Sequence, residues 1–371
     1  MNNHDTGYTS MTSHLQPVEH VDDISANWIT AALRQDGLSG VVSEVSSKPI
    51  GTGQMADSFR IDLGFASVDA SHDMPQSVVV KMQAEDELSR QAGAGGAYSS
   101  EMRFYTELAS TVSIRTPHCY FAIGPDDEGR FALVLEDMAP AEQGDQLLGC
   151  DVESARSAVI NLAGLHGPRW CDPTLVDVVP YRSAEETAFL ASVVAESTAG
   201  FIAHYGDRVD AEDVLVLQAF APKCGKWLVD NRDRFAPVHG DYRLDNLLFG
   251  KSDDGSVEVS AVDWQTLDLG LPGRDLGYFL GNSLLPGDRR ASEKELVSAY
   301  YNALLGHGVE DYSLEQCFED YRYGQFQGLM ITVLAAVGLA HTERGDDMFM
   351  AMSSRACEAI RDLDSLALLE R

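Results

Sequence analysis

The sequence has few features of an exported or membrane-spanning protein. Its six cysteines form no C-x-x-C pair, which argues against a disulfide framework or a cysteine zinc site and favours reduced thiols. They are Cys119, Cys150, Cys171, Cys224, Cys317 and Cys357. The longest apolar run, residues 328–340, is shorter than the ~20 residues that cross a bilayer and predicts a buried helix. Residues 1–20 lack the basic start and apolar stretch of a signal peptide, and we expect a polar, mobile tail. These absences predict a cytoplasmic protein with no membrane partner.

Positive charge is also scarce. The chain has 27 Lys and Arg against 58 Asp and Glu, a formal net charge of −31, and no basic cluster interrupts this excess. Such a field repels phosphate backbones, so nucleic acid is excluded as a partner. It is compatible with a cationic substrate, but we favour the interpretation that it keeps the protein soluble. G-x-S-x-G and H-E-x-x-H motifs are missing, which leaves serine hydrolases and zinc proteases without support.

The order of the predicted elements indicates an α+β fold. With 371 residues, 44% of them hydrophobic, the chain is long enough for two lobes. Residues 59–65 alternate apolar and polar side chains, as a half-buried strand does, and residues 77–82 and 130–138 read as further strands. Helical periodicity dominates afterwards, apart from one hairpin. We therefore predict a nucleotide-binding N-terminal lobe over residues 21–138 and a larger, mainly helical lobe over residues 139–371.

The segment "HGDYRLDN" (239–246) has the spacing of a phosphoryl-transfer loop. Protein kinases carry H-R-D-x-x-x-x-N, in which the Asp accepts the proton of the substrate hydroxyl and the Asn binds Mg²⁺. Here His239, Asp241 and Asn246 are in register, and Gly240 replaces the Arg. The apolar "LLF" that follows would anchor the loop on the core. Asp241 is thus the candidate catalytic carboxylate and Asn246 a candidate metal ligand.

A second metal ligand is expected to be a carboxylate, because Mg²⁺ prefers hard oxygen donors. Asp263 in "AVDWQ" ends an apolar strand 17 residues after Asn246. The hairpin between them would return both residues to the same end of two paired strands, so that both could reach one ion.

The remaining parts of such a site lie upstream. Lys81 closes a strand with three Val, in position to pair with nucleotide phosphates. Glu101 is its candidate partner, since it shares a helical face with apolar residues whereas Glu107 faces outward. Gly51 and Gly53 in "GTGQMA" form a glycine-poor version of the loop over the phosphates. The same spacing can open a dinucleotide-binding fold, but there a helix follows at once, whereas here an alternating strand follows.

Taken singly, each residue has a structural explanation. Asp241 and Asn246 are typical of Asx-rich turns, Asp263 can cap the next segment, and Lys81 with Glu101 can form an ordinary ion pair. Their common order and workable spacing favour the catalytic interpretation.

These motifs, with "RDLGYF" (274–279) and "EMRFY" (101–105), resemble the aminoglycoside phosphotransferase and choline kinase superfamily. "GTGQMADSFR", "EMRFY" and "VDWQ" most resemble its ecdysteroid-kinase-like branch and related bacterial phosphotransferases. The resemblance covers residues 50 to about 280. It implies a protein-kinase-like bilobal fold, with an antiparallel sheet and one key helix in the N-terminal lobe.

The resemblance also implies roles for individual residues. Asp241 would be the catalytic carboxylate, Asn246 and Asp263 the magnesium ligands, and Lys81 the phosphate-binding lysine held by Glu101. The strand end from Leu135 through Glu136 to Met138 would meet the adenine with its backbone. Asp275 and His239 would brace the catalytic loop. His166, at a predicted helix end, is assigned to packing.

The sequence favours a small acceptor over a peptide. Asp263 and Asp275 are only 12 residues apart and no A-P-E element follows, which leaves little room for a peptide platform. We therefore predict a small-molecule kinase that uses ATP and Mg²⁺ and phosphorylates a hydroxylated metabolite other than an aminoglycoside. The alternatives are an aminoglycoside or other antibiotic phosphotransferase and, from another class, a nucleotide-binding pseudokinase that acts as an interaction module. No feature of the sequence indicates an oligomeric state.

Overall fold

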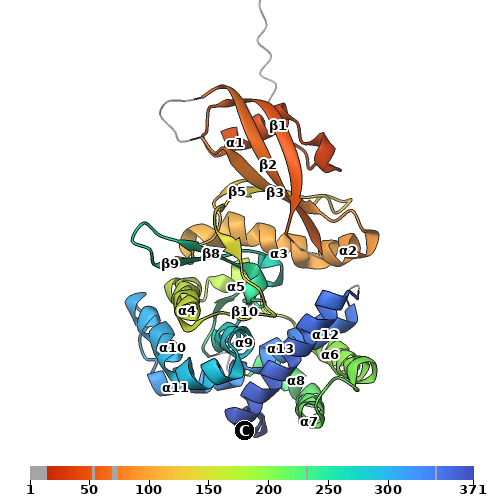
Figure 1. Cartoon of the computed structure of the whole chain (residues 1–371), viewed down its shortest axis with the longest axis vertical. Coiled ribbons are helices and arrows are strands. Elements are labelled where there is room, and N and C mark those ends of the chain that lie inside the picture. The colour runs from red at the N-terminus through yellow and green to blue at the C-terminus, as the bar shows by residue number, and fades with distance from the viewer. Residues whose placement is uncertain (1–14, 52–54, 69–73, 231–232, 339–340) are drawn as a thin grey trace, which may run out of the picture. The chain divides into compact units, whose positions relative to one another are not determined.

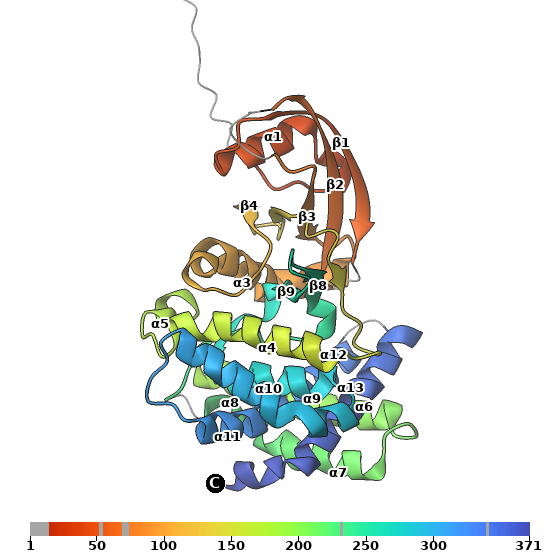
Figure 2. The ribbon, with the colours of Figure 1, turned by 60° about the vertical axis from the view of Figure 1, so that its left-hand side comes forward.

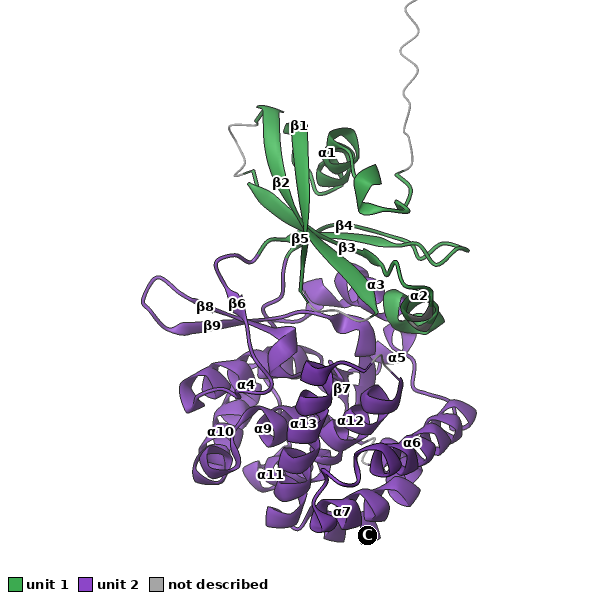
Figure 3. Ribbon diagram, turned by 45° about the vertical axis from the view of Figure 1, so that its right-hand side comes forward, with its two compact units in different colours: residues 1–98, 118–137 green, residues 99–117, 138–371 purple. Residues whose placement is uncertain are grey.

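The computed structural model describes residues 15–51, 55–68, 74–230, 233–338 and 341–371. The chain forms two compact units, coloured separately in Figure 3. Unit 1 comprises residues 1–98 and 118–137, and unit 2 comprises residues 99–117 and 138–371. Residues 1–14 of the expected tail and Gly53 of the expected phosphate loop lie outside the described residues.

Unit 1 is built on a five-stranded antiparallel sheet in the order β1-β2-β3-β5-β4. Its strands are β1 (Val41–Ile50), β2 (Ala56–Ser67), β3 (Ser77–Gln83), β4 (Cys119–Ile123) and β5 (Ala132–Glu136), and its helices are α1 (Ala26–Gln35) and α2 (Glu87–Ala92). Figure 1 shows α1 near β1. The alternation predicted for residues 59–65 falls within β2, where Ile61 is fully buried. Ile61 joins Ile29 and Leu33 of α1 and Val78 and Val80 of β3 in one core.

Unit 2 contains short strands and most of the helices. The strands are β6 (Glu142–Gln143), β7 (Ala236–Val238), β8 (Leu247–Lys251), β9 (Val257–Ala261) and β10 (Asp268–Gly270). They form a three-stranded sheet, β6-β8-β9, and a two-stranded sheet, β10-β7. The helices are α4 (Val152–His166), α5 (Leu175–Val178), α6 (Ala184–Tyr205), α7 (Ala211–Phe220), α8 (Cys224–Val229), α9 (Gly273–Ser283), α10 (Pro286–Gly306), α11 (Leu314–Gly324), α12 (Phe326–Gly338) and α13 (Glu343–Asp362). The predicted α+β class, with an antiparallel sheet in the N-terminal part and helices in the C-terminal part, is confirmed.

Helix α9 lies at the centre of unit 2. All eleven of its residues are buried, and α4, α10, α11, α12 and α13 contact it, as Figures 1 and 2 allow the reader to follow. Its crossing with α11 is close because both helices contribute glycine. A Cβ atom on Gly324 would lie 1.7 Å from the carbonyl oxygen of Gly273. This crossing therefore requires glycine.

The helix that carries Glu101 is grouped with unit 2, whereas the sequence analysis placed it in the N-terminal lobe. Helix α3 (Tyr98–Arg103) is followed by a wider π-type turn at Phe104–Leu108 in place of the expected continuous helix. Phe104 and Leu108 pack in the core of unit 2, where the ring of Phe104 stacks on Trp264 with the centroids 3.4 Å apart.

In the described part of the chain, every helix is too short or too polar to cross a membrane.

Candidate active site

The loop between β7 and β8 carries the predicted catalytic residues. Gly240 turns the chain there with φ +79°, in the left-handed region that favours glycine. A Cβ atom at this position would lie 2.5 Å from the carbonyl oxygen of Thr266. The Arg that protein kinases carry at this point could not be accommodated, so the replacement noted in the sequence follows from local crowding.

Asp275, buried on α9, holds the backbone of this loop. Its carboxylate accepts hydrogen bonds from the amide of His239 (2.6 Å), the amide of Gly240 (2.9 Å) and Nε2 of His166 (3.3 Å). Burial alone would raise the pKa of Asp275, but the interactions with His166, His239 and Gly240 outweigh it and lower the pKa. Asp275 is therefore an ionised brace beneath the loop.

The two histidines of this region serve the same scaffold. His239 accepts the amide hydrogen of Asp241 at Nδ1 (3.3 Å) and donates from Nε2 to the carbonyl of Val262 (3.0 Å). It therefore ties the catalytic loop to the strand end before Asp263. His166 is fully buried, and its Nδ1 lies 2.7 Å from the hydroxyl of Tyr300. Both hydrogen-bond partners of His166, Asp275 and Tyr300, are buried residues of unit 2.

The carboxylate of Asp241 receives three side-chain donors. Tyr278 donates to Oδ1 at 2.7 Å, and Nδ2 of Asn246 donates to Oδ2 at 2.8 Å. Nε of Arg243 lies 3.2 Å from Oδ2. Asp241 keeps 17% of its side-chain surface exposed, so it is fixed in orientation and still reachable. This combination suits a group that must accept a proton from a bound hydroxyl.

Asn246 and Asp263 lie at the same end of the β8–β9 hairpin. Leu247 pairs with Ala261, and the amide of Val262 donates to the carbonyl of Asn246 at 3.0 Å. The amide nitrogen of Asn246 points to Asp241, which leaves its oxygen as the atom of the group suited to a metal. Asp263 has a left-handed backbone (φ 68°, ψ 73°). For a non-glycine residue this costs of order 1–3 kcal/mol and is concentrated at functional sites. An amide oxygen and a carboxylate at one hairpin end fit the oxygen preference of Mg²⁺.

Glu101 contacts the same hairpin from α3. It is 1% exposed, and its Oε1 accepts the amide hydrogen of Trp264 at 3.3 Å, directly after Asp263. Glu107 is exposed, so the faces predicted for this helix are confirmed.

The other predicted nucleotide-binding residues lie in or beside unit 1. Lys81 is buried on β3, paired with Ser58 of β2 and Leu133 of β5. Gly51 directly follows β1 and has φ +73°. Glu136 ends β5, and Met138 is the first residue of the C-terminal stretch of unit 2. The pairing of Lys81 with Glu101 stays a prediction.

Several residues that contact the loop were not predicted. Nη1 of Arg243 donates to Asp245 at 2.8 Å in addition to its contact with Asp241. Burial would lower the pKa of Arg243, but the charges of Asp241 and Asp245 outweigh it and raise the pKa. Tyr278 lies three residues after Asp275, on the same face of α9, and that spacing could have revealed it. Nε2 of Gln327 donates to the carbonyl of Gly240 at 2.6 Å, and no sequence signal marks it.

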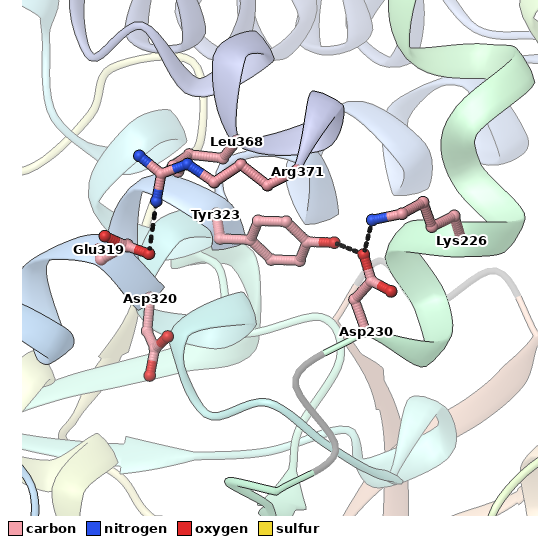
Figure 4. A pocket seen from close by; sticks show the side chains of 7 residues that line it. All are labelled: Lys226, Asp230, Glu319, Asp320, Tyr323, Leu368 and Arg371. Atoms are coloured by element: carbon pink, nitrogen blue, oxygen red, sulfur yellow. Dashed lines mark hydrogen bonds and ion pairs between the residues drawn. The ribbon is translucent and has the colours of Figure 1, made fainter.

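Unit 2 also has a cavity of about 280 Å³ that contains none of the predicted residues. Figure 4 shows its side chains, which come from α8, α11 and the C-terminal end: Lys226, Asp230, Glu319, Asp320, Tyr323, Leu368 and Arg371. Its charged groups pair with one another, Lys226 with Asp230 and Arg371 with Glu319.

Comparisons with known proteins were made for the whole chain. A search of curated proteins gave no match. A family model described as "Uncharacterized oxidoreductase dhs-27" matches residues 234–362, and this family is ecdysteroid-kinase-like. The matched segment includes the catalytic loop and Asp263.

Solved structures match over most of the chain. Choline kinase from Cryptosporidium parvum has a TM-score of 0.58 at 11% identity, covering 88% of this chain and 94% of that one. A candidate aminoglycoside phosphotransferase from Ralstonia eutropha JMP134 has a TM-score of 0.53 at 18% identity, covering 91% and 97%. Ethanolamine kinase from Plasmodium vivax has a TM-score of 0.51 at 10% identity, covering 86% and 83%. The chain has the aminoglycoside phosphotransferase and choline kinase fold. The predicted resemblance is confirmed at this level.

Proposed function

We propose that this protein is an ATP-dependent kinase that transfers the γ-phosphoryl group to a hydroxyl of a small molecule other than an aminoglycoside. The observation that supports this proposal most strongly is the hydrogen-bond network around Asp241. This carboxylate is oriented by Tyr278 and Asn246, and Asn246 lies opposite Val262 at the hairpin end that leads to Asp263.

In this proposal Asp241 accepts the proton of the acceptor hydroxyl. Tyr278 and Arg243 keep its carboxylate in one orientation, which supports catalysis by positioning. The oxygens of Asn246 and Asp263 would hold Mg²⁺. When bound, Mg²⁺ neutralises charge on the transferring phosphoryl group.

The nucleotide would be held by the remaining predicted residues. Lys81, oriented by Glu101, would meet the α- and β-phosphates, and the loop of Gly51 and Gly53 would cover them. The backbone from Glu136 to Met138 would meet the adenine.

The segment between Asp263 and Asp275 favours a small acceptor. It forms a 3₁₀ turn at Trp264–Thr266, strand β10 and the start of α9. All of residues 264–272 except Thr266 are buried. A segment packed into the core cannot serve as a surface platform for a peptide.

The charges beside Asp241 favour an acceptor that is not a polycation. Asp245 is paired with Arg243, and Arg344 lies 3.7 Å from Asp245 and 3.8 Å from Asp145. Carboxylates already matched by arginines attract amino groups less strongly. The aminoglycoside alternative is weaker for this reason, and the presence of every catalytic part argues against a pseudokinase.

A screen of hydroxylated metabolites and antibiotics with Mg-ATP tests the proposal. Mass spectrometry should detect a product heavier by one phosphoryl group with a metabolite and not with aminoglycosides. The Asp263→Ala variant should lose Mg²⁺-dependent nucleotide binding. Binding of Mg-ATP with no product across the panel would replace the kinase with the pseudokinase, and a phosphorylated aminoglycoside would replace the acceptor class.

A further inference from the structure

Two histidines and an aspartate meet in unit 2 where the end of α6 approaches the start of α13. His204 is the penultimate residue of α6, His341 precedes α13 and Asp346 lies in its first turn. One potential ligand atom from each of the three residues lies within 4.8 Å of the other two. Within the described ranges, no second group of three His, Cys, Asp or Glu side chains meets this distance.

The distances suit a metal centre after a small adjustment. Nδ1 of His341 lies 3.2 Å from Oδ1 of Asp346, and the rings of His204 and His341 stack with centroids 4.7 Å apart. Ligand atoms on one Zn²⁺ ion lie ~3–4 Å apart, since each Zn–N or Zn–O bond is about 2.0–2.2 Å. Because all three ligand atoms lie within 4.8 Å of one another, rotation of an exposed histidine can bring the third ligand to a bonding distance.

A buried tyrosine supports the acidic ligand. The hydroxyl of Tyr205 donates to Oδ1 of Asp346 at 2.6 Å and lies 3.2 Å from Nδ1 of His341. Metal-binding carboxylates are commonly oriented by such outer hydrogen bonds.

A separate ion pair ties the same two segments. Nη2 of Arg208 lies 2.6 Å from Oδ1 of Asp347, one residue beyond Asp346. It uses none of the three ligands. Contacts outside the three candidate ligands therefore also hold His204 close to His341 and Asp346.

We infer that His204, His341 and Asp346 bind a divalent transition-metal ion of the Zn²⁺ type, with water completing the coordination. Two imidazole nitrogens and one carboxylate form a ligand set typical of zinc, and three protein ligands leave a position open to solvent. The predicted magnesium ligands, Asn246 and Asp263, offer oxygen only. The inference does not depend on the proposed kinase activity.

The position gives the ion a structural consequence. Arg344, between His341 and Asp346, reaches Asp245 of the catalytic loop at 3.7 Å and Asp145 at 3.8 Å. A bound ion would fasten the segment that carries Arg344 to the end of α6. The bound ion would then hold the segment that carries Arg344 beside Asp245 more firmly than its exposed ion pairs do.

Zinc titration of the full chain tests this inference. The protein is stripped with a chelator, and Zn²⁺ is titrated by calorimetry in excess Mg²⁺, which occupies oxygen-only sites. We expect one saturable site. The variants His204→Ala, His341→Ala and Asp346→Asn should each weaken its affinity by at least about 10–100-fold, and Tyr205→Phe by about 10-fold. The matched control is His307→Ala, which changes an exposed histidine at the end of α10 and should leave the affinity unchanged.

Cobalt distinguishes this ligand set from cysteine binding. Co²⁺ at the site should show ligand-field absorption without an intense thiolate charge-transfer band. A thiolate band, or an affinity for Zn²⁺ that the three ligand variants leave unchanged, would overturn the inference. So would the absence of saturable Zn²⁺ binding.

Discussion

Two regions of unit 2 use the same three kinds of side chain with different results. At the catalytic loop, Asp241 is contacted by Arg243 and by the hydroxyl of Tyr278. Beside the cavity of Figure 4, Asp320 is contacted by Arg234 and by the hydroxyl of Tyr312 (3.0 Å). Each region thus contains an aspartate, an arginine and a tyrosine.

The regions differ in how the arginine is used. Arg234 grips Asp320 with two parallel hydrogen bonds of 2.9 Å, one to each carboxylate oxygen. Arg243 is divided between Asp241 and Asp245. The side chain of Asp320 is 3% exposed and that of Asp241 is 17% exposed. The aspartate held by the bidentate pair is therefore closed to solvent, and the one held by a single arginine contact stays accessible.

The largest difference is expected in turnover. Asp241→Asn should lower kcat by about 10²–10⁴-fold, because the amide cannot accept the hydroxyl proton. The dissociation constant for Mg-ATP should barely change. The measurements are steady-state kinetics, with the acceptor from the metabolite screen, and nucleotide titration. Asp320→Asn is the matched control and should retain the kcat of the folded protein. Equal turnover in both variants would remove the distinction between the two regions.

The free energy of unfolding should show the opposite order. Asp320→Asn leaves Arg234 without its bidentate partner and with Asp233, whose side chain is 71% exposed, so the variant should lose about 1.5–3 kcal/mol. Asp241→Asn should cost less, because Arg243 keeps Asp245. Urea denaturation of both variants measures the difference. A larger loss of unfolding free energy for Asp241→Asn would mean that the contacts of Asp241 stabilise the fold more than those of Asp320 do.

The two tyrosines provide a milder form of the comparison. Tyr278→Phe removes a hydrogen bond to Asp241 worth about 1.5–3 kcal/mol, so kcat should fall by roughly 10-fold or more if this bond positions the carboxylate. Tyr312→Phe removes the corresponding bond to Asp320 and should lower only the free energy of unfolding. Kinetics and denaturation of both variants would show whether positioning and stability separate in this way.

The smallest effect concerns Asp275, the fully buried carboxylate beneath the catalytic loop. Its pKa is lowered in the folded protein, so the unfolded chain binds more protons in the window below the ordinary pKa of about 3.9. Its contribution to the free energy of unfolding is complete well above the unfolded pKa, from about pH 5, and is lost as the pH falls from there through the folded pKa. Urea denaturation between pH 5 and pH 3 measures the loss. His166→Gln removes a hydrogen bond that lowers this pKa and should flatten that dependence. An unchanged slope would contradict the assignment.

Local patterns predicted much of the fold and part of the site. Alternation located β2, and the spacing of His239, Asp241 and Asn246 located the loop whose geometry the structure describes. The face of Glu101 was also predicted, because it depends only on helical periodicity.

The donors to the loop come from distant segments and were not predicted. Tyr278 follows Asp241 by 37 residues and Gln327 follows Gly240 by 87. The three-residue spacing from Asp275 could have revealed Tyr278, but no local pattern marks Gln327, since tertiary packing of α12 brings it there. The π-type turn at Phe104–Leu108 was not predicted either, and its Phe104 packs against Trp264, which lies 160 residues further along the chain.

The crossing of α9 and α11 at two glycines connects substitutions there to the position of residues near Asp241. Because Gly324 leaves no space for a methyl group against Gly273, a larger residue at either position would push α9 and α11 apart. Tyr278 and Asp275 both belong to α9, so a displacement of α9 would also displace the hydroxyl and the carboxylate that contact the loop. If Asp241 is the proton acceptor, substitutions at this distant helix crossing should lower activity without any contact with Asp241.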